Sequence, residues 1–97
     1  MIRSFADAAI EDIFNAVNSV DARRRLPRKL WDVAFRELDL IDSATQLDDL
    51  RSPPGNRLER LKGDRVGEFS IRINEQYRIC FRWDGAEPES VKIVDYH

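Results

Sequence analysis

The sequence predicts an α+β fold in which two helices in the first half of the chain cover one face of an antiparallel sheet built by the second half. Apolar residues recur at helical spacing in the first half. Residues 68–83 instead alternate apolar and polar side chains, and a period of two is typical of strands. Because an amphipathic helix must bury its apolar stripe against another element, this order of elements indicates two packed layers.

The alternating stretch defines the centre of the sheet. Residues 74–76 interrupt the alternation and read as the loop of a hairpin. Only an odd loop length keeps the apolar side chains of both strands on one face, since a slip of one residue moves them to the other face. With three loop residues, the predicted cross-strand pairs are Ile73 with Tyr77, Ile71 with Ile79, Phe69 with Phe81, Glu68 with Arg82 and Arg72 with Arg78.

The last of these pairs points to an anionic ligand on an exposed polar face. Like charges directly opposite each other destabilise a strand pair, although two long arginine stems can splay into water at little cost. Arg60 and Lys62 are expected to reach the same face from the preceding segment. A sheet with one apolar and one cationic face favours a phosphate-bearing ligand.

The helices and the first strand come from the N-terminal part of the chain. Residues 2–5 are apolar enough for a strand. Residues 6–19 follow with apolar positions at helical spacing, and Ser4 or Asp7 can cap this first helix. Pro27 suits the first turn of a second helix, whose wide apolar stripe runs to about Ser43. Both stripes are interpreted as core.

The C-terminal part supplies the remaining strands. Residues 53–56, with the sequence PPGN, form a loop because proline and glycine interrupt regular structure. Residues 58–61 form a short strand, residues 63–65 turn into the hairpin, and residues 90–95 form the last strand.

The composition bounds the class of protein. A chain of 97 residues is predicted to form one domain, residues 1–97. No apolar run approaches the length of a membrane span, and the acidic N-terminus lacks a signal peptide, so a cytoplasmic protein without a membrane partner is expected. A single histidine and a single cysteine give no cluster of metal ligands, and neither a metal site nor a cofactor is predicted.

Charge is unevenly distributed along the chain. The net charge of −2 argues against nucleic-acid binding through bulk charge alone. A basic block lies between the two predicted helices, at a helix start where the dipole disfavours cations. Its members are Arg23, Arg24, Arg25, Arg28 and Lys29. A solvated loop and a nucleic-acid contact are both open for this block.

The run LKGDRVGEFSIRINEQYRICFRW, followed by the terminal IVDYH, closely resembles HigB-type toxins of the RelE/ParE superfamily. The resemblance implies a small twisted sheet, largely antiparallel, with two N-terminal helices packed on one face in the order β-α-α-β-β-β-β. It also implies a toxin that cuts mRNA on the ribosome as a metal-independent endoribonuclease. The implied partners are ribosomal RNA and a HigA-like helix-turn-helix antitoxin, with operator DNA bound only through that antitoxin.

The resemblance assigns roles to individual residues. Lys62 and Arg78 would stabilise charge on the phosphorus, since cations positioned there lower the barrier. His97 would act as acid or base, Tyr96 would stack on a base or orient the 2′-OH, and Asp95 would orient the histidine or act as base. The predicted RNA contacts are the basic block with Arg60 and Arg72.

Glu59 departs from the family pattern. Members with a second catalytic histidine place it three residues before the lysine, the position of Glu59 here. A carboxylate can act as a general base but cannot bind phosphate as an imidazolium does. Glu59 is therefore either a replacement base or a strand residue paired with Arg57 or Arg60. Two alternatives stay open beside the nuclease: a gyrase-inhibiting toxin of the ParE branch, and an attenuated toxin acting mainly as antitoxin partner and co-repressor.

Overall fold

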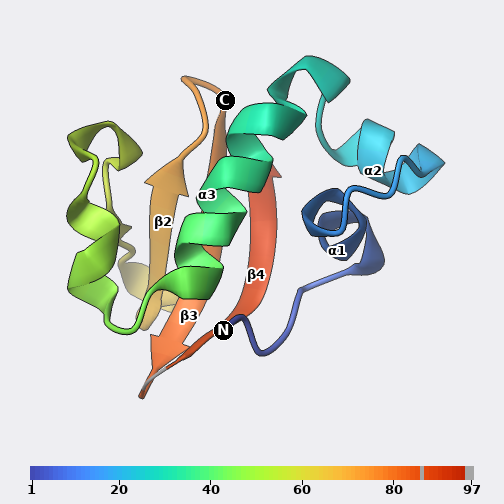
Figure 1. The fold of residues 1–97 in the computed structure, drawn as a ribbon. Helices are drawn as coiled ribbons and strands as arrows, with labels where there is room; N and C mark the ends of the chain where they lie inside the picture. Colours follow the sequence, from blue (N-terminus) through green and yellow to red (C-terminus); the bar gives the residue numbers. More distant parts are fainter. Residues whose placement is uncertain (86, 96–97) are drawn as a thin grey trace.

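The computed structural model describes residues 1–85 and 87–95, and it confirms a layer of helices on one face of an antiparallel sheet (Figure 1). The α-helices are α1 (Ala8–Phe14), α2 (Val20–Arg25) and α3 (Trp31–Ser43). The strands are β1 (Glu59–Arg60), β2 (Glu68–Arg72), β3 (Tyr77–Asp84) and β4 (Glu87–Asp95). The 3₁₀ helices are η1 (Arg28–Leu30), η2 (Leu47–Arg51), η3 (Pro54–Asn56) and η4 (Gly63–Arg65).

The four strands follow chain order across the sheet, and each pairs antiparallel with the next. The predicted hairpin register is confirmed, because Phe69 pairs with Phe81 and Arg72 with Arg78. The loop is closed by the Ile73 N–H, which donates to the carbonyl of Tyr77 at 3.0 Å. Alternation of polarity was therefore sufficient to define the register.

The predicted strand at residues 2–5 is reduced to one parallel bridge between Phe5 and Val91. β4 begins earlier than expected, at Glu87, and Pro88 pairs with Trp83. The register shifts between Cys80 and Arg82, and Ser90 opposite this point has a φ of 53°. This irregularity turns β4 toward the N-terminal segment, where the Ser90 N–H donates to Ser4 Oγ at 2.9 Å.

The first predicted helix, residues 6–19, is shortened to α1, and α2 lies in the segment predicted as a link. Asp7 caps α1 as expected, accepting from the Ile10 N–H at 3.1 Å. The helix ends after Phe14 because Ala16 adopts a left-handed backbone with φ of 61°, which cannot continue an α-helix. Ser19 then caps α2 by accepting from the Ala22 N–H at 3.1 Å.

Replacing Ser19 with alanine is expected to destabilise the protein by about 1 kcal/mol, because the cap of α2 loses its acceptor. Urea unfolding monitored by circular dichroism measures this change. A Ser43→Ala variant, at the exposed last residue of α3, serves as the control and should unfold with the wild-type midpoint. Equal midpoints for the two variants would show that the cap does not stabilise α2.

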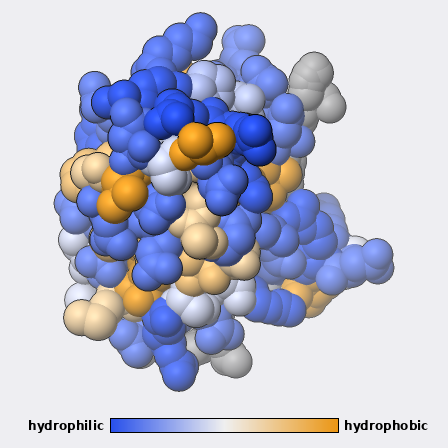
Figure 2. Space-filling model, turned by 90° about the vertical axis from the view of Figure 1, so that its right-hand side faces the viewer, coloured by the Kyte–Doolittle hydropathy of each residue, from blue (hydrophilic) through white to orange (hydrophobic). Residues whose placement is uncertain are grey.

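The core lies between the helices and the sheet. Its fully buried side chains include Ile10, Leu38, Ile71 and Phe81. The side of the molecule that carries α1 and α2 is largely hydrophilic, with small separate apolar areas (Figure 2). Within the described residues, no helix has the length and apolar character needed to cross a bilayer.

Candidate functional site

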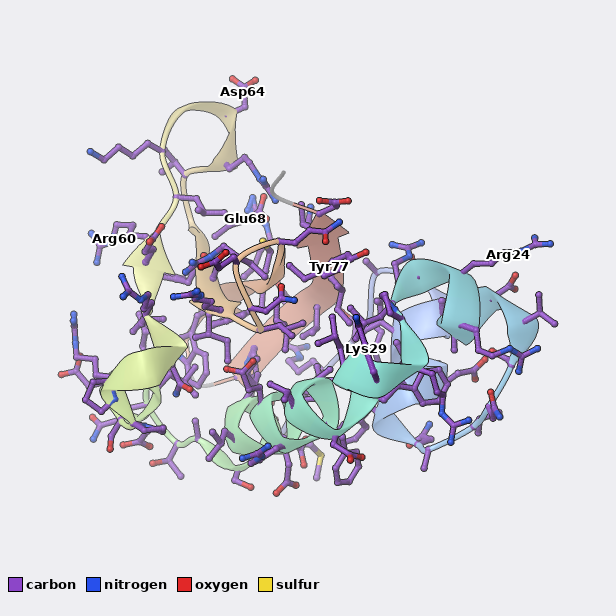
Figure 3. All side chains as sticks on the ribbon, turned by 90° about the horizontal axis from the view of Figure 1, so that it is seen from above. Arg24, Lys29, Arg60, Asp64, Glu68 and Tyr77 are labelled. Atoms are coloured by element: carbon purple, nitrogen blue, oxygen red, sulfur yellow. The ribbon has the colours of Figure 1, made fainter. Side chains whose placement is uncertain are left out.

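The sheet face opposite the helices, here called the open face, carries the charged residues of the alternating stretch. Figure 3 shows α3 on one side of the sheet and the η4 loop with Asp64 extending beyond the other side. Side chains in register across strands share a face. Three such rows cross the open face: Glu68 with Arg82 and Glu89, Glu59 with Ser70, Cys80 and Lys92, and Arg72 with Arg78 and Val94.

Arg78 lies at the centre of this face but is not exposed there. Its side chain is only 10% exposed, which corrects the expectation of a solvated arginine. The Nε donates to Ser70 Oγ at 2.8 Å and Nη2 donates to the Arg57 carbonyl at 2.6 Å. Ser70 is itself fully buried, so this hydrogen bond is shielded from water. The guanidinium is thus held in one orientation.

Glu59 faces Arg78 across the edge of the sheet. Its Oε1 lies 3.8 Å from Arg78 Nη2, and its side chain is 55% exposed. The ion pair with Arg78 replaces the predicted pairing with Arg57 or Arg60. A shallow pocket of about 280 Å³ surrounds this pair, lined by Arg57, Glu59, Arg72, Asn74, Glu75 and Arg78. The pocket places an exposed carboxylate beside an oriented guanidinium.

Lys62 and Arg60 occupy different positions. Lys62 is exposed and precedes the η4 loop, which extends on the open side (Figure 3). Arg60 instead pairs in register with Phe69, and its guanidinium carbon lies 5.5 Å from the centre of that ring. The prediction that Arg60 shares the polar face with Arg78 is therefore wrong, because β1 presents Glu59 and Arg60 to opposite sides.

The C-terminal group is only partly described. Asp95 is exposed at the end of β4, pairs in register with Tyr77, and accepts from Gln76 Nε2 at 3.1 Å. Because Val94 is the residue opposite Arg78, strand alternation directs Asp95 to the other face. Tyr96 and His97 lie outside the described residues, so their predicted roles stay predictions.

The basic block does not join this pocket. Its three arginines were expected in a link but form the last turn of α2, where the helix dipole favours cations. Arg28 and Lys29 lie in η1, directly before α3, as expected. Arg25 bonds Asp7 at 2.7 Å, and Arg23 donates to Asn18 Oδ1 at 2.7 Å. In Figure 3 Arg24 and Arg60 lie at opposite ends of the molecule. Arg72 is the one predicted RNA contact that lines the pocket.

A second charged cluster on the open face was not predicted. Glu68 pairs in register with Arg82, as predicted, and its carboxylate lies 3.6 Å from both Arg65 and Lys92. Cys80 is buried in the adjacent row. Burial raises the pKa of its thiol, and the charges of Arg65 and Lys92 partly oppose this. The thiol is therefore interpreted as a small packing group.

Glu37 is a further residue that sequence reasoning missed. It is buried in α3 with 6% exposure, and within the described part of the chain its Oε1 has no hydrogen-bond partner. Burial raises its pKa to about 7, while the charges of Arg36 and Arg78 act in the opposite direction. The only signal in the sequence is its position beside the apolar stripe of the helix.

No group of three or more His, Cys, Asp or Glu side chains in residues 1–85 and 87–95 is arranged to hold a metal ion. The chemically competent groups described here are therefore the oriented Arg78, the Glu59 carboxylate beside it, and Lys62 at the edge. Arginine and lysine stabilise anionic oxygens, and a carboxylate accepts a proton.

Comparison with known proteins agrees with this fold. The family model described as the RelE-like toxin of the type II toxin–antitoxin system HigB matches residues 3–97. Toxin HigB-1 of Vibrio cholerae is 42% identical over 84 residues, covering 86% of this chain and 84% of its own length. Endoribonuclease HigB of Proteus vulgaris is 29% identical over the full length of both chains.

Solved structures show the same fold at lower sequence identity. The toxin–antitoxin complex YoeB–YefM from Staphylococcus aureus contains a chain with a TM-score of 0.63 and 22% identity, covering 100% of this chain and 95% of that chain. YoeB/ParE toxin from Agrobacterium tumefaciens has a TM-score of 0.54 and 17% identity, covering 99% and 98%. The fold, the family match and the curated relatives agree, and this chain belongs to the family of HigB-like toxins of type II toxin–antitoxin systems.

Proposed function

We propose that this toxin is an endoribonuclease that cuts mRNA on the ribosome without a metal ion and is neutralised by an antitoxin. The observation that carries the proposal is the pairing of the oriented Arg78 guanidinium with the Glu59 carboxylate, 3.8 Å away, in a pocket on the open face. The similarity to a protein named Endoribonuclease HigB supports it. Dependence on the ribosome rests on the resemblance to HigB-type toxins.

The proposed reaction is an attack of the ribose 2′-OH on the adjacent phosphorus. The 2′-oxygen bonds to phosphorus, the bond to the 5′-oxygen breaks, and the products are a 2′,3′-cyclic phosphate and a 5′-hydroxyl. Glu59 takes the 2′-OH proton, and Arg78 with Lys62 stabilises the negative charge that grows on the phosphoryl oxygens. His97 gives a proton to the departing 5′-oxygen, and Tyr96 orients the reacting groups. Asp95 has no role in this step, because β4 directs it to the other face of the sheet.

The Arg78–Glu59 ion pair also favours a second candidate, the attenuated toxin. A carboxylate bound to the phosphate-binding arginine competes with the phosphate for that arginine. If Glu59 is only a competitor, its neutralisation frees Arg78 and accelerates cleavage. If Glu59 is the base, its neutralisation removes the proton acceptor and slows cleavage.

Cleavage mapping on translating ribosomes tests the proposal. A reporter mRNA on purified ribosomes is treated with the wild type, Lys62→Ala, His97→Ala and Glu59→Gln, and cuts are located by primer extension. We expect cuts with the wild type, about 100-fold less cleavage for Lys62→Ala and His97→Ala, and a comparable loss for Glu59→Gln. Arg51→Ala, exposed in η2, is the control for general loss of charge.

The outcomes separate the candidates. Faster cleavage by Glu59→Gln assigns Glu59 as a competitor and favours the attenuated toxin. Absence of cuts in every sample, with growth still arrested in cells, overturns the nuclease proposal and makes DNA gyrase inhibition the next assay.

A further inference from the structure

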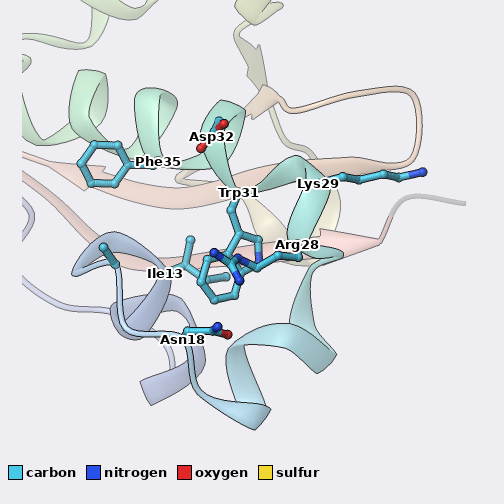
Figure 4. A pocket seen from close by; sticks show the side chains of 8 residues that line it. Ile13, Asn18, Arg28, Lys29, Trp31, Asp32 and Phe35 are labelled. Atoms are coloured by element: carbon cyan, nitrogen blue, oxygen red, sulfur yellow. The ribbon is translucent and has the colours of Figure 1, made fainter.

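A groove on the helical layer lies apart from the pocket around Arg78 and shares no lining residue with it. Figure 4 shows it between the end of α1, η1 and the first turns of α3. Its volume of about 430 Å³ is within the range of pockets that accept ligands or several side chains. The lining residues are Ile13, Ala16, Asn18, Arg28, Lys29, Trp31, Asp32 and Phe35.

The floor of the groove is apolar and partly exposed. Phe35 is 45% exposed although it belongs to a core-forming helix. Its ring stacks on Phe14 at 6.3 Å between centroids, and Phe14 in turn contacts Phe5 at 5.6 Å. Val17, next to Ala16 in the wall, is 47% exposed. An exposed aromatic ring at the end of a half-buried aromatic row is well suited to contact another apolar side chain.

The walls of the groove are held rigidly. Trp31 donates its indole N–H to the Leu26 carbonyl at 2.9 Å inside the protein. Asn18 accepts from Arg23 through both its side chain and its carbonyl, at 2.7 and 3.0 Å. A preformed groove binds with a smaller loss of conformational freedom than a mobile one.

The rim determines the chemistry of the occupant. Arg28 lies 5.0 Å from the Trp31 ring centre, and Lys29 extends away from the groove floor (Figure 4). Neither cation forms an ion pair with any residue that the structure describes. An acidic, amphipathic peptide complements an apolar floor with a cationic rim. The Asp32 carboxylate in the lining repels phosphates and acidic side chains alike, so the acidic residues of such a peptide are expected beside Arg28 and Lys29.

We infer that this groove docks a segment of the antitoxin, in which an apolar side chain of leucine or phenylalanine size enters over Phe35 and adjacent Asp or Glu residues contact Arg28 and Lys29. The inference rests on the antitoxin partner of the proposed function and is independent of the nuclease chemistry. Phe35 is the central contact, because buried aromatic anchors dominate the affinity of protein interfaces.

Titration of the toxin with the antitoxin encoded in the same operon tests the inference. Isothermal calorimetry compares the wild type with Phe35→Asp and with the double variant Arg28→Glu/Lys29→Glu. Phe35→Asp should bind at least about 30-fold more weakly. The double variant should bind more weakly and lose most of the salt dependence of binding. Val66→Asp, another substitution at an exposed apolar side chain, should bind like the wild type.

Two further measurements separate a local loss of binding from unfolding and from general inactivation. Circular dichroism checks that each variant is folded. If Phe35→Asp does not fold, the double variant still tests the inference, because Arg28 and Lys29 are both exposed and their replacement is not expected to unfold the protein. In cells, Phe35→Asp should still arrest growth but no longer be neutralised when the antitoxin is expressed with it.

Three results overturn the inference. The inference is wrong if both groove variants bind the antitoxin as tightly as the wild type does. Loss of ribosome association with antitoxin binding intact assigns the groove to ribosomal RNA. A wild-type dimer that Phe35→Asp dissociates, with antitoxin binding intact, assigns it to a second copy of the chain. Failure of the wild type itself to bind the antitoxin contradicts the proposed partner rather than the location of its site.

Discussion

Arg78→Ala is expected to reduce RNA cleavage by at least about 100-fold, because loss of one oriented donor to a transition-state oxyanion has an effect of this size. The substitution also removes the contacts of a buried guanidinium, among them those to Ser70 Oγ, the Arg57 carbonyl and Glu59. Breaking such a network leaves buried acceptors without donors and costs about 2–3 kcal/mol. The melting temperature should fall by roughly 10–20 °C.

Loss of activity must therefore be separated from loss of stability. Ser70→Ala is the matched control, since it removes the hydroxyl that orients Arg78 but retains the charge. Ser70→Ala is expected to lower the free energy of unfolding by about 1–2 kcal/mol and to retain more cleavage activity than Arg78→Ala. Arg78→Lys keeps the charge but cannot reach both Ser70 and the Arg57 carbonyl, because only guanidinium has a planar fork of donors.

Cleavage and thermal unfolding of the three variants are measured at a temperature where all remain folded. Cleavage by Arg78→Lys should fall further than by Ser70→Ala, because the orientation of the donor is lost. If cleavage instead follows stability across the three variants, Arg78 acts only by holding β1 and the Arg57 segment in place.

These expectations depend on burial that the sequence did not reveal. The period of two assigned Arg78 to a face and paired it correctly with Arg72, because the register follows from polarity alone. The burial of the Arg78 guanidinium on that face depends on Ser70 and on the backbone carbonyl of Arg57. Arg57 belongs to a segment far from Arg78 in the sequence. No local pattern encodes such an approach.

Short elements also could not be predicted from the periodicity of apolar residues. β1 has only two residues, too few to show alternation, and Arg60 was consequently assigned to the wrong face. The helix predicted for residues 6–19 ends at Phe14, because Ala16 takes a left-handed backbone, a conformation that alanine seldom adopts and that its identity does not predict. The Asn-Ser pair before α2 was the available signal, since Ser19 caps that helix.

Glu37 should make the protein less stable as the pH rises through neutrality. The folded-state pKa is about 7, raised by burial from 4.5. Below about pH 4.5 the carboxyl is protonated in both the folded and the unfolded chain, so it contributes no pH dependence. Between the two values the unfolded chain releases the proton while the folded chain keeps it, and stability therefore falls with rising pH. The fall amounts to about 3 kcal/mol and is complete above about pH 7.

Urea unfolding between pH 4 and pH 8 measures this effect. Glu37→Gln removes the titrating group with little change of shape, so most of the fall in stability across this range should disappear. Asp49 provides an internal contrast. Hydrogen bonds from the backbone of Thr45 and Gln46 lower the pKa of Asp49. The stability that Asp49 contributes is therefore lost only as the pH falls below the ordinary pKa of 3.8.

Arg78 is coupled to this titration from the sheet. Its positive charge lowers the pKa of Glu37, so Arg78→Ala should raise that pKa further and extend the loss of stability to higher pH. Glu37→Gln in the Arg78→Ala background should then remove the extension. A stability profile that is the same for the wild type and Glu37→Gln would show that the carboxyl finds a partner or water in solution and titrates near its ordinary pKa. In that case the helix layer carries no neutral buried acid beneath the candidate site.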